Sequence, residues 1–330
     1  MTDGRALVGC LSHDWVGGRM KALVLGGSGF IGSHLVDRLL AAGHDVRVMD
    51  RRHELYRTPL PDVDYHIGDF GNRAQLCATL DDRDVVFHLV STTVPHTSND
   101  DPAFDVMSNV VETLYLLEQC VRTSVRKVVF ASSGGAVYGT PASLPVSEDA
   151  PANPQSSYGI GKLTIEKYLA LYHRLHGLDY AIVRPSNPYG PRQNHLGDQG
   201  VVAVFMGRIA AGQPIEVWGD GESVKDYVFI GDLVDGIYRA ATLNTRSKVF
   251  NLGSGIGLSV NELVRLIGEV VGREVTVLRS SEDIFDVSRI YLDTTRAKRE
   301  LDWQPTTPMQ AGLEQTWEFI TQALKWLGER

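Results

Sequence analysis

The chain has 330 residues, of which 43% are hydrophobic and 22% charged, and its formal net charge is −8. This composition is ordinary for a globular protein of one large or two smaller domains, and the dispersed acids without a basic stripe argue against a nucleic-acid partner. No apolar run approaches the ~18 residues of a membrane span, and the cysteines are too widely spaced for a zinc site and favour a reducing cytoplasm, namely Cys10, Cys77 and Cys120.

The first 19 residues are predicted to be an N-terminal extension. They lack the basic start and the continuous apolar stretch of a signal peptide. Met20 directly precedes the first convincing strand, so this segment is either disordered or lies upstream of a natural start at Met20.

Short apolar runs rich in β-branched residues alternate with helical patterns through the first half of the chain. Strands are predicted at 21–27, 45–50, 63–69, 85–90, 127–132 and 179–186, and helices at 33–44, 105–123 and 156–177. Strand and helix in alternation predict an α/β fold with a doubly wound parallel sheet, the Rossmann fold.

A glycine pattern joins the first predicted strand to the first helix. Gly26, Gly29 and Gly32 permit a tight turn and a close backbone approach to a pyrophosphate at the helix N-terminus. Asp50 ends the second strand, 18 residues after Gly32, where a carboxylate accepts hydrogen bonds from an adenosine ribose. The combination predicts a dinucleotide site that prefers NAD to NADP, although Arg51 and Arg52 argue weakly the other way.

Two further strand ends lie beside the expected cofactor. Asp69 ends the third strand and is placed to meet the adenine edge; the equal alternative is that Asp69 is the N-cap of a helix that begins near Asn72. Residues 88–92, "HLVST", end the fourth strand next to the same site.

The alternating pattern loosens after Pro185. A glycine- and proline-rich loop is followed by short β segments and by a helical, mixed C-terminal region. We therefore expect a nucleotide-binding domain at 20–186 and a smaller mixed α/β substrate domain at 187–330, from which one or two strands could return to the sheet.

Tyr158 and Lys162 are spaced four residues apart at a predicted helix start and so share one face. A tyrosine loses its proton near pH 10, and a neighbouring ammonium favours the phenolate. Such a tyrosine can act as a general base near neutral pH. The alternative, a surface pair without a catalytic role, loses weight beside the dinucleotide turn.

These motifs resemble the extended short-chain dehydrogenase/reductases, and within them the nucleotide-sugar epimerases and dehydratases, over residues 21–325. The motifs that carry the resemblance are "GGSGFIG", "GDF", "HLVST", "SSGGAVYG", "YGIGK", "RPSNPYGPRQ" and "KDYVFIGDLVDGI". Proteins similar to UDP-glucose 4-epimerase match best. The resemblance implies bound NAD, a nucleoside diphosphate sugar as substrate with a UDP-sugar favoured, and a homodimer built through the helices at 101–122 and 157–176.

The resemblance also implies a set of site residues and a mechanism. Tyr158 removes the proton of the sugar C4 hydroxyl while NAD takes the C4 hydride, and the 4-keto sugar turns over and is reduced on its other face. Lys162 also holds the nicotinamide ribose. The implied cofactor contacts are Gly26, Gly29, Phe30, Ile31, Gly32, Asp50, Asp69, Phe70, Leu89, Ser91, Asn109, Ser132, Tyr158, Lys162 and Pro185; the implied substrate contacts are Ser133, Tyr158, Asn187, Lys225 and Arg289.

The hydroxyl that assists the tyrosine in this family is displaced here. The usual position falls on Gly134, so the role is assigned to Ser133, 25 residues before Tyr158, with Ser132 as the second candidate and strand capping as the alternative. Ser132 is expected to face the cofactor or a backbone group. The related dehydratases and decarboxylases carry acids just after this hydroxyl, whereas this chain has Gly134, Gly135 and Ala136, which favours simple epimerisation.

The diphosphate contacts also depart from the family pattern. A phosphate-binding arginine is replaced by Lys225, which keeps the charge but loses the bidentate fork. A second arginine position falls on Asp283, so Arg279 or Arg289 would have to substitute. Asn187 matches the asparagine that contacts the diphosphate, with a turn role before Pro188 as the alternative.

The leading function is an NAD-dependent 4-epimerase acting on UDP-glucose and UDP-galactose or on an N-acetylated or uronic relative. The alternatives are a nucleotide-sugar reductase or dehydrogenase with exchangeable cofactor, and an NAD-binding regulator without catalysis. The intact Tyr158 and Lys162 oppose the regulator.

Overall fold

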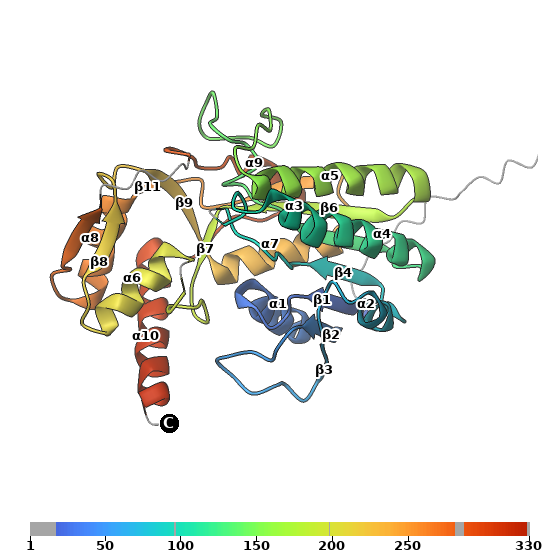
Figure 1. Ribbon diagram of the computed structural model, residues 1–330, viewed down its shortest axis with the longest axis horizontal. Coiled ribbons are helices and arrows are strands. Elements are labelled where there is room, and N and C mark those ends of the chain that lie inside the picture. Colours follow the sequence, from blue (N-terminus) through green and yellow to red (C-terminus); the bar gives the residue numbers. More distant parts are fainter. Residues whose placement is uncertain (1–17, 96, 198, 281–286, 329–330) are drawn as a thin grey trace, which may run out of the picture.

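A seven-stranded parallel sheet forms the centre of the computed structural model, which describes residues 18–328 except 96, 198 and 281–286 (Figure 1). Residues 1–17 of the predicted extension and Asp283 thus lie outside the described residues. The strand order is β10 (Val249–Leu252), β6 (Asp179–Pro185), β5 (Lys127–Ala131), β4 (Val85–His88), β1 (Lys21–Leu25), β2 (Asp45–Asp50) and β3 (Val63–Ile67). The predicted doubly wound parallel sheet is confirmed.

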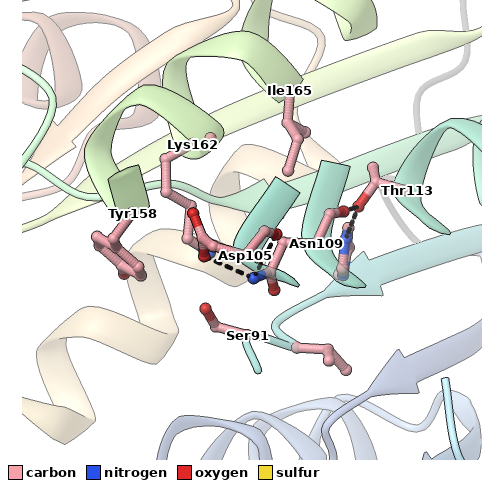
Figure 2. Close-up of a pocket in the computed structure, with 10 residues that line it drawn as sticks. Ser91, Asp105, Asn109, Thr113, Tyr158, Lys162 and Ile165 are labelled. Atoms are coloured by element: carbon pink, nitrogen blue, oxygen red, sulfur yellow. Dashed lines mark hydrogen bonds between the residues drawn. The ribbon is translucent and has the colours of Figure 1, made fainter. Parts of the chain in front are cut away.

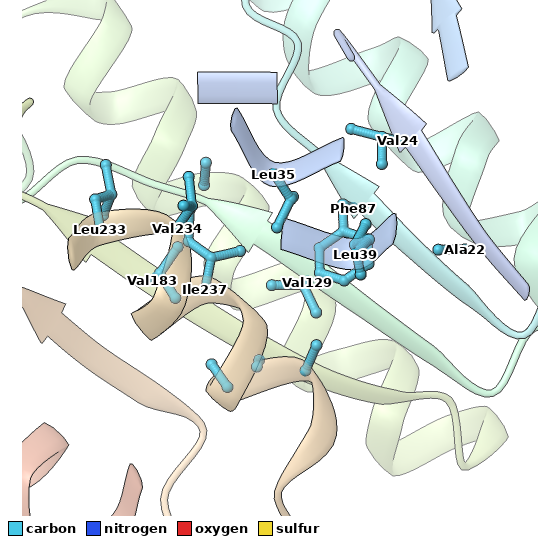
Figure 3. Close-up of a cluster of buried hydrophobic side chains, with 14 of the residues drawn as sticks. Ala22, Val24, Leu35, Leu39, Phe87, Val129, Val183, Leu233, Val234 and Ile237 are labelled. Atoms are coloured by element: carbon cyan, nitrogen blue, oxygen red, sulfur yellow. The ribbon is translucent and has the colours of Figure 1, made fainter. Parts of the chain in front are cut away.

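Helices cover both faces of this sheet because its buried strands alternate their side chains between two cores. On β1, Ala22 and Val24 face one core, while Leu23 and Leu25 face the other. The first core packs against α1 (Phe30–Ala41) and α7 (Ile230–Thr242), which Figure 3 shows converging through Leu35, Leu39, Leu233 and Ile237. The second packs against α2 (Arg73–Leu80), α4 (Glu112–Arg122) and α5 (Ser157–His176).

The predicted helix at 105–123 is a composite of three pieces. It runs through α3 (Pro102–Asp105), the π-helix η1 (Val106–Val111) and α4. Asp101 accepts a hydrogen bond from the Phe104 amide, and Pro102 occupies the first turn, so the helix begins earlier than its apolar pattern suggests. The π turn is notable because such turns occur frequently at functional sites.

The second part of the chain has its own core at one end of the molecule (Figure 1). It contains a three-stranded sheet of β7 (Asn187–Tyr189), β9 (Val224–Phe229) and β11 (Gly257–Ser259), and a two-stranded sheet of β8 (Ile215–Trp218) and β12 (Val277–Ser280). The helices α6 (Val201–Ala210), α8 (Val260–Val271) and α10 (Met309–Gly328) pack around them. The helix α9 (Thr295–Leu301) instead contacts β10 and α7, beside the central sheet.

One strand of the second part returns to the central sheet, as the sequence left open. β10 pairs in parallel with β6 from Val249 opposite Ile182 to Leu252 opposite Pro185. The α7 helix that precedes β10 also packs on the central sheet. The two parts are therefore connected by several chain crossings.

Within the part of the chain that the structure describes, no helix is long and apolar enough to cross a membrane. No group of histidine, cysteine or acidic side chains in those residues is arranged to hold a metal ion.

Candidate active site

The glycine turn between β1 and α1 is closed to side chains. Gly26 has a φ of +82°, which favours glycine, and a Cβ on Gly32 would lie 2.1 Å from the Gly26 carbonyl oxygen. The Asp50 carboxylate accepts hydrogen bonds from the amides of Ser28 at 3.0 Å and Arg51 at 2.7 Å, which places it against the turn. Phe30 and Ile31 follow in the first turn of α1, partly buried against the core. These residues fit a dinucleotide whose pyrophosphate lies at the α1 N-terminus.

Side-chain hydrogen bonds hold the turn between β3 and α2. Asp69 accepts a hydrogen bond from the Gly71 amide at 2.8 Å, and Asn72 is the N-cap of α2, accepting from the Gln75 amide. The N-cap alternative for Asp69 is therefore wrong: the cap is Asn72. Phe70 is buried, with its ring 5.1 Å from that of His88.

The ends of β4 and β6 lie near the same edge of the sheet. Leu89 is partly buried on the core, and Ser91 donates a hydrogen bond to the Thr93 carbonyl at 2.9 Å. Asn109, on the π-helix, accepts from the Thr92 amide at 3.0 Å. Pro185 at the end of β6 accepts from the Gly134 amide at 2.8 Å. Ser91 and Asn109 line one small cavity together with Tyr158 and Lys162. The cofactor contacts of Leu89, Ser91, Asn109 and Pro185 stay predictions.

The tyrosine and lysine lie at the N-terminal end of α5, over the end of β5 (Figure 2). The Lys162 ammonium donates to the Ala131 carbonyl at 2.9 Å and lies 5.5 Å from the centre of the Tyr158 ring. Burial lowers the pKa of Lys162 to about 8, although the Asp105 and Glu166 carboxylates oppose this. Burial likewise raises the pKa of the half-buried Tyr158 to about 12; a hydrogen bond with Ser133 acts against that rise and Asp105 adds to it.

The two neighbouring serines have different surroundings. Ser133 interacts with the Tyr158 side chain, whereas Ser132 is buried and donates to Glu166 at 2.6 Å. The expectation that the Ser132 hydroxyl faces the cofactor or a backbone group is wrong, because a buried carboxylate stands directly beneath it. A Cβ on Gly134 would lie 2.6 Å from Leu292 and 3.0 Å from the Pro185 carbonyl oxygen. A side chain at that position would therefore require the Leu292 side chain to shift.

Behind the serines lies a buried polar network. Glu166 pairs with Arg184 through bonds of 2.9 and 2.5 Å, and Arg184 also donates to the Tyr138 hydroxyl at 2.9 Å. Tyr138 in turn donates to Asn251 on β10 at 2.6 Å. The network ties the site to the returning strand, and each of these side chains has a partner.

Two of the side chains predicted to contact the diphosphate donate hydrogen bonds to backbone carbonyls. Asn187 donates from its amide to the Asp226 carbonyl at 2.9 Å, and the Lys225 ammonium donates to the Val287 carbonyl. Arg279 donates to the Asp220 carbonyl at 2.6 Å and to Asn261 at 3.0 Å. These bonds argue against Arg279 as the replacement for the missing phosphate-binding arginine. Arg289 is exposed beside β9. Asp283 lies outside the described residues.

Sequence reasoning missed the polar side chains that hold the start of α5. Asp105 is 1% exposed and accepts hydrogen bonds from Asn109 at 2.9 Å, from Thr93 and from Ser157 at 2.7 Å. The signal available in the sequence was the i, i+4 spacing of Asp105 and Asn109 on one helical face.

Comparison with known proteins covers both parts of the chain. A model of the NAD dependent epimerase/dehydratase family matches residues 22–253. The chain is 41% identical over 308 residues to the UDP-glucose 4-epimerase of Mycolicibacterium smegmatis, covering 91% of this chain and 98% of that one.

Two solved structures share the fold. One is a UDP-glucose 4-epimerase from Thermotoga maritima with UDP-glucose, with a TM-score of 0.88, 35% identity, and coverage of 92% of this chain and 100% of the other. The second is a UDP-glucose 4-epimerase from Thermus thermophilus with NAD, with a TM-score of 0.85, 32% identity and the coverages 92% and 100%. Both similarities extend through the central sheet and the second part.

Proposed function

Because the chain belongs to the NAD-dependent epimerase/dehydratase family, as its motifs indicated, we propose that it is an NAD-dependent epimerase that inverts C4 of a nucleoside diphosphate sugar. The observation that carries this is the placement of Tyr158, Lys162 and Ser133 together at the carboxyl end of β5, at the same edge of the parallel sheet as the glycine turn that follows β1, two strands away. Ligands bind at this edge in open parallel sheets. We further propose that residues 20–186 hold NAD and residues 187–330 hold the sugar nucleotide, apart from the returning β10.

NAD, when bound, accepts a hydride from the sugar C4 and returns it to the other face. The residues that would hold NAD are those of the glycine turn, Asp50 at the end of β2, and Lys162. The 2.1 Å approach of a Gly32 Cβ to the Gly26 carbonyl supports this assignment, because the third glycine of a dinucleotide-binding turn lets the helix pack closely against the strand.

Tyr158 holds the proton that moves to and from the sugar O4. With a pKa of about 12 it is a neutral phenol at pH 7, so it becomes a base only where positive charge lies nearby. Lys162, with a pKa of about 8, supplies an ammonium at neutral pH. Ser133 donates or accepts at the same sugar oxygen and so steadies the charge that develops there.

The segment after Ser133 limits the reaction to epimerisation. Gly134, Gly135 and Ala136 have no carboxylate side chain. This segment therefore offers no group to assist a dehydration or a decarboxylation. An added side chain at Gly134 would press on Leu292 and on the Pro185 carbonyl oxygen.

A UDP-sugar is the proposed substrate, with Asn187, Lys225 and Arg289 toward its diphosphate. The similarity to enzymes named for UDP-glucose supports the nucleotide. Arg289 is exposed and so accessible to phosphate, and the Lys225 ammonium, which has three N–H donors, can keep its bond to the Val287 carbonyl while it donates to a phosphate.

We also propose a homodimer through the helices at 101–122 and 157–176. Phe104, Met107 and Ile160 are 54%, 58% and 52% exposed on these helices, which is a large apolar area to leave in water. The free thiols of Cys77 and Cys120 support a cytoplasmic location.

The test is incubation of the protein with UDP-, dTDP- and GDP-sugars, followed by NMR of the products. An epimerase interconverts one C4 pair without accumulating NADH. Net NADH accumulation indicates a dehydrogenase instead, and absence of any product across the panel removes the proposed function.

Tyr158→Phe is the matched control for that assay. It should retain NAD and substrate but lose at least ~10²-fold in turnover, the scale of general acid–base catalysis. Calorimetry of NAD binding shows that the variant is intact. Turnover at the wild-type rate contradicts the proton-transfer role.

A further inference from the structure

Asp105 is a buried carboxylate whose hydrogen-bond donors are all neutral. One oxygen accepts from the Asn109 amide at 2.9 Å and from the Thr93 hydroxyl, and the other accepts from the Ser157 hydroxyl at 2.7 Å. A buried carboxylate ordinarily has a cationic partner. None of these donors is charged, so none of them neutralises the Asp105 carboxylate. Its electrostatic field therefore reaches the neighbouring groups.

Those surroundings include the catalytic pair. Asp105, Lys162 and Tyr158 line one small cavity, in which Figure 2 shows the Lys162 side chain extending down from α5 toward Asp105. The Gly161 backbone of α5 lies against the same carboxylate, since a Cβ there would be 3.6 Å from its oxygen.

Asp105 also belongs to a set of contacts that fasten the first turn of α5. Asn99 accepts a hydrogen bond from the Ser157 amide at 2.9 Å, and Ser98 accepts from the Tyr158 amide at 3.1 Å. Asp105 adds the bond from the Ser157 side chain. The backbone of Tyr158 is therefore held from the segment between β4 and the π-helix.

The other charged and titratable groups around the pair are already engaged or neutral. Glu166 on α5 is paired with Arg184 of β6. His88 of β4 accepts no proton at neutral pH, because burial lowers its pKa to about 3, and it bonds Thr113 at 2.8 Å. Asp105 on α3 is the remaining carboxylate in the described lining of this cavity.

We propose that Asp105 is a positioning residue for the Tyr158–Lys162 pair: it fastens the first turn of α5 and supplies the negative charge that keeps Lys162 an ammonium. The catalytic meaning of this inference rests on the proposed function, whereas the effect of Asp105 on Lys162 does not. It predicts that the charge state of Lys162 depends on Asp105 even in the absence of substrate.

Asp105→Asn and Ser157→Ala separate the two parts of the proposal. The amide of D105N keeps the size, still accepts from Asn109 and Thr93, and can donate to Ser157, so the charge is lost with little else. S157A removes one hydrogen bond and keeps the charge.

The readout is NMR of lysine labelled with ¹³C at the ε carbon, titrated between pH 6 and 10. The Lys162 signal is assigned by its absence in Lys162→Met. We expect a wild-type midpoint near the pKa of about 8, an unchanged midpoint in S157A, and a midpoint lower by at least about half a pH unit in D105N. An equal or higher midpoint in D105N overturns the proposal.

Two further measurements keep the outcome decisive. If D105N does not fold, ¹³Cγ-aspartate NMR of the wild-type protein must show Asp105 ionised at pH 7; a protonated Asp105 overturns the proposal. Since neither titration uses substrate, a Lys162 shift without any epimerised sugar refutes the proposed function alone. Epimerase activity with an unshifted Lys162 refutes this inference alone.

Discussion

A buried lysine side chain lies at each end of β5: Lys127 belongs to the strand itself, and Lys162 reaches its other end from α5. At the amino end, Lys127 donates to the carbonyls of Ala240 at 2.8 Å and Ala241 at 3.0 Å, which closes the C-terminus of α7. At the carboxyl end, Lys162 donates to the Ala131 carbonyl at 2.9 Å. Burial lowers the pKa of both ammonium groups to about 8.

The shared pKa shift shows that perturbation alone does not identify a catalytic lysine. Lys127 meets the α7 carbonyls and lies 3.9 Å from the Asp179 carboxylate, which is itself bonded to Lys248. Lys162 meets Tyr158 and Asp105 at the edge where parallel strands bind ligands. What distinguishes them is the set of neighbours and the end of the strand.

Replacing each lysine with methionine gives the largest expected contrast. Lys162→Met should lose about 10²-fold in kcat, the scale for removal of one fixed electrostatic group. Lys127→Met should leave kcat unchanged and lower the free energy of unfolding by roughly 2–3 kcal/mol, because it leaves buried carbonyls unsatisfied. The measurements are kcat on the best sugar and urea unfolding, and a reversed pattern would mean that the ends have been assigned wrongly.

The neighbouring serines sharpen the comparison within the carboxyl end. Ser133→Ala should lose about 10- to 150-fold in kcat, since a hydrogen bond to developing charge is worth roughly 1.5–3 kcal/mol. Ser132→Ala removes a bond to the buried Glu166 and should mainly lower stability, by about 1 kcal/mol. Both variants are assayed side by side with thermal melts, and a larger kcat loss in Ser132→Ala would move the role to Ser132.

The pH dependence of the free energy of unfolding tests the amino end of β5, through the shifted pKa of Lys127. Because the pKa of Lys127 falls from 10.5 to about 8 on folding, the unfolded chain binds more protons at this site between those values. The stability of wild type relative to Lys127→Met should therefore rise with pH from about 8 to about 10, by at most about 1.4 kcal/mol per unit. Urea unfolding at pH 7, 8, 9 and 10 measures it, and a fall over this range would show that the helix carbonyls favour the ammonium.

Local patterns in the sequence were sufficient for the sheet and for much of the site. The glycine turn, Asp50 and the Tyr158–Lys162 spacing each lie within a single strand, turn or helix, so their arrangement follows from local geometry. Asp105 was missed because its partner Ser157 is 52 residues away, and nothing local marks their contact. The Ser132 expectation failed because Glu166, 34 residues later, comes to lie directly beneath it.

The diphosphate side depends still more on distant segments. Lys225 bonds Val287, which follows the undescribed residues 281–286, and Arg279 bonds a loop 59 residues earlier. The replacement of an arginine by Lys225 is visible in the sequence. The bond from its ammonium to the Val287 carbonyl is not.

The return of β10 to the edge of the sheet has a consequence for biosynthesis. Residues 20–186 include all the strands of the central sheet except β10. Until Leu252 has left the ribosome, β6 is therefore an open edge with unpaired backbone groups. The nascent chain must therefore carry this exposed edge while more than 60 further residues are made, at roughly 5–20 residues per second. For several seconds of each synthesis, the unpaired edge of β6 is available to pair with another chain.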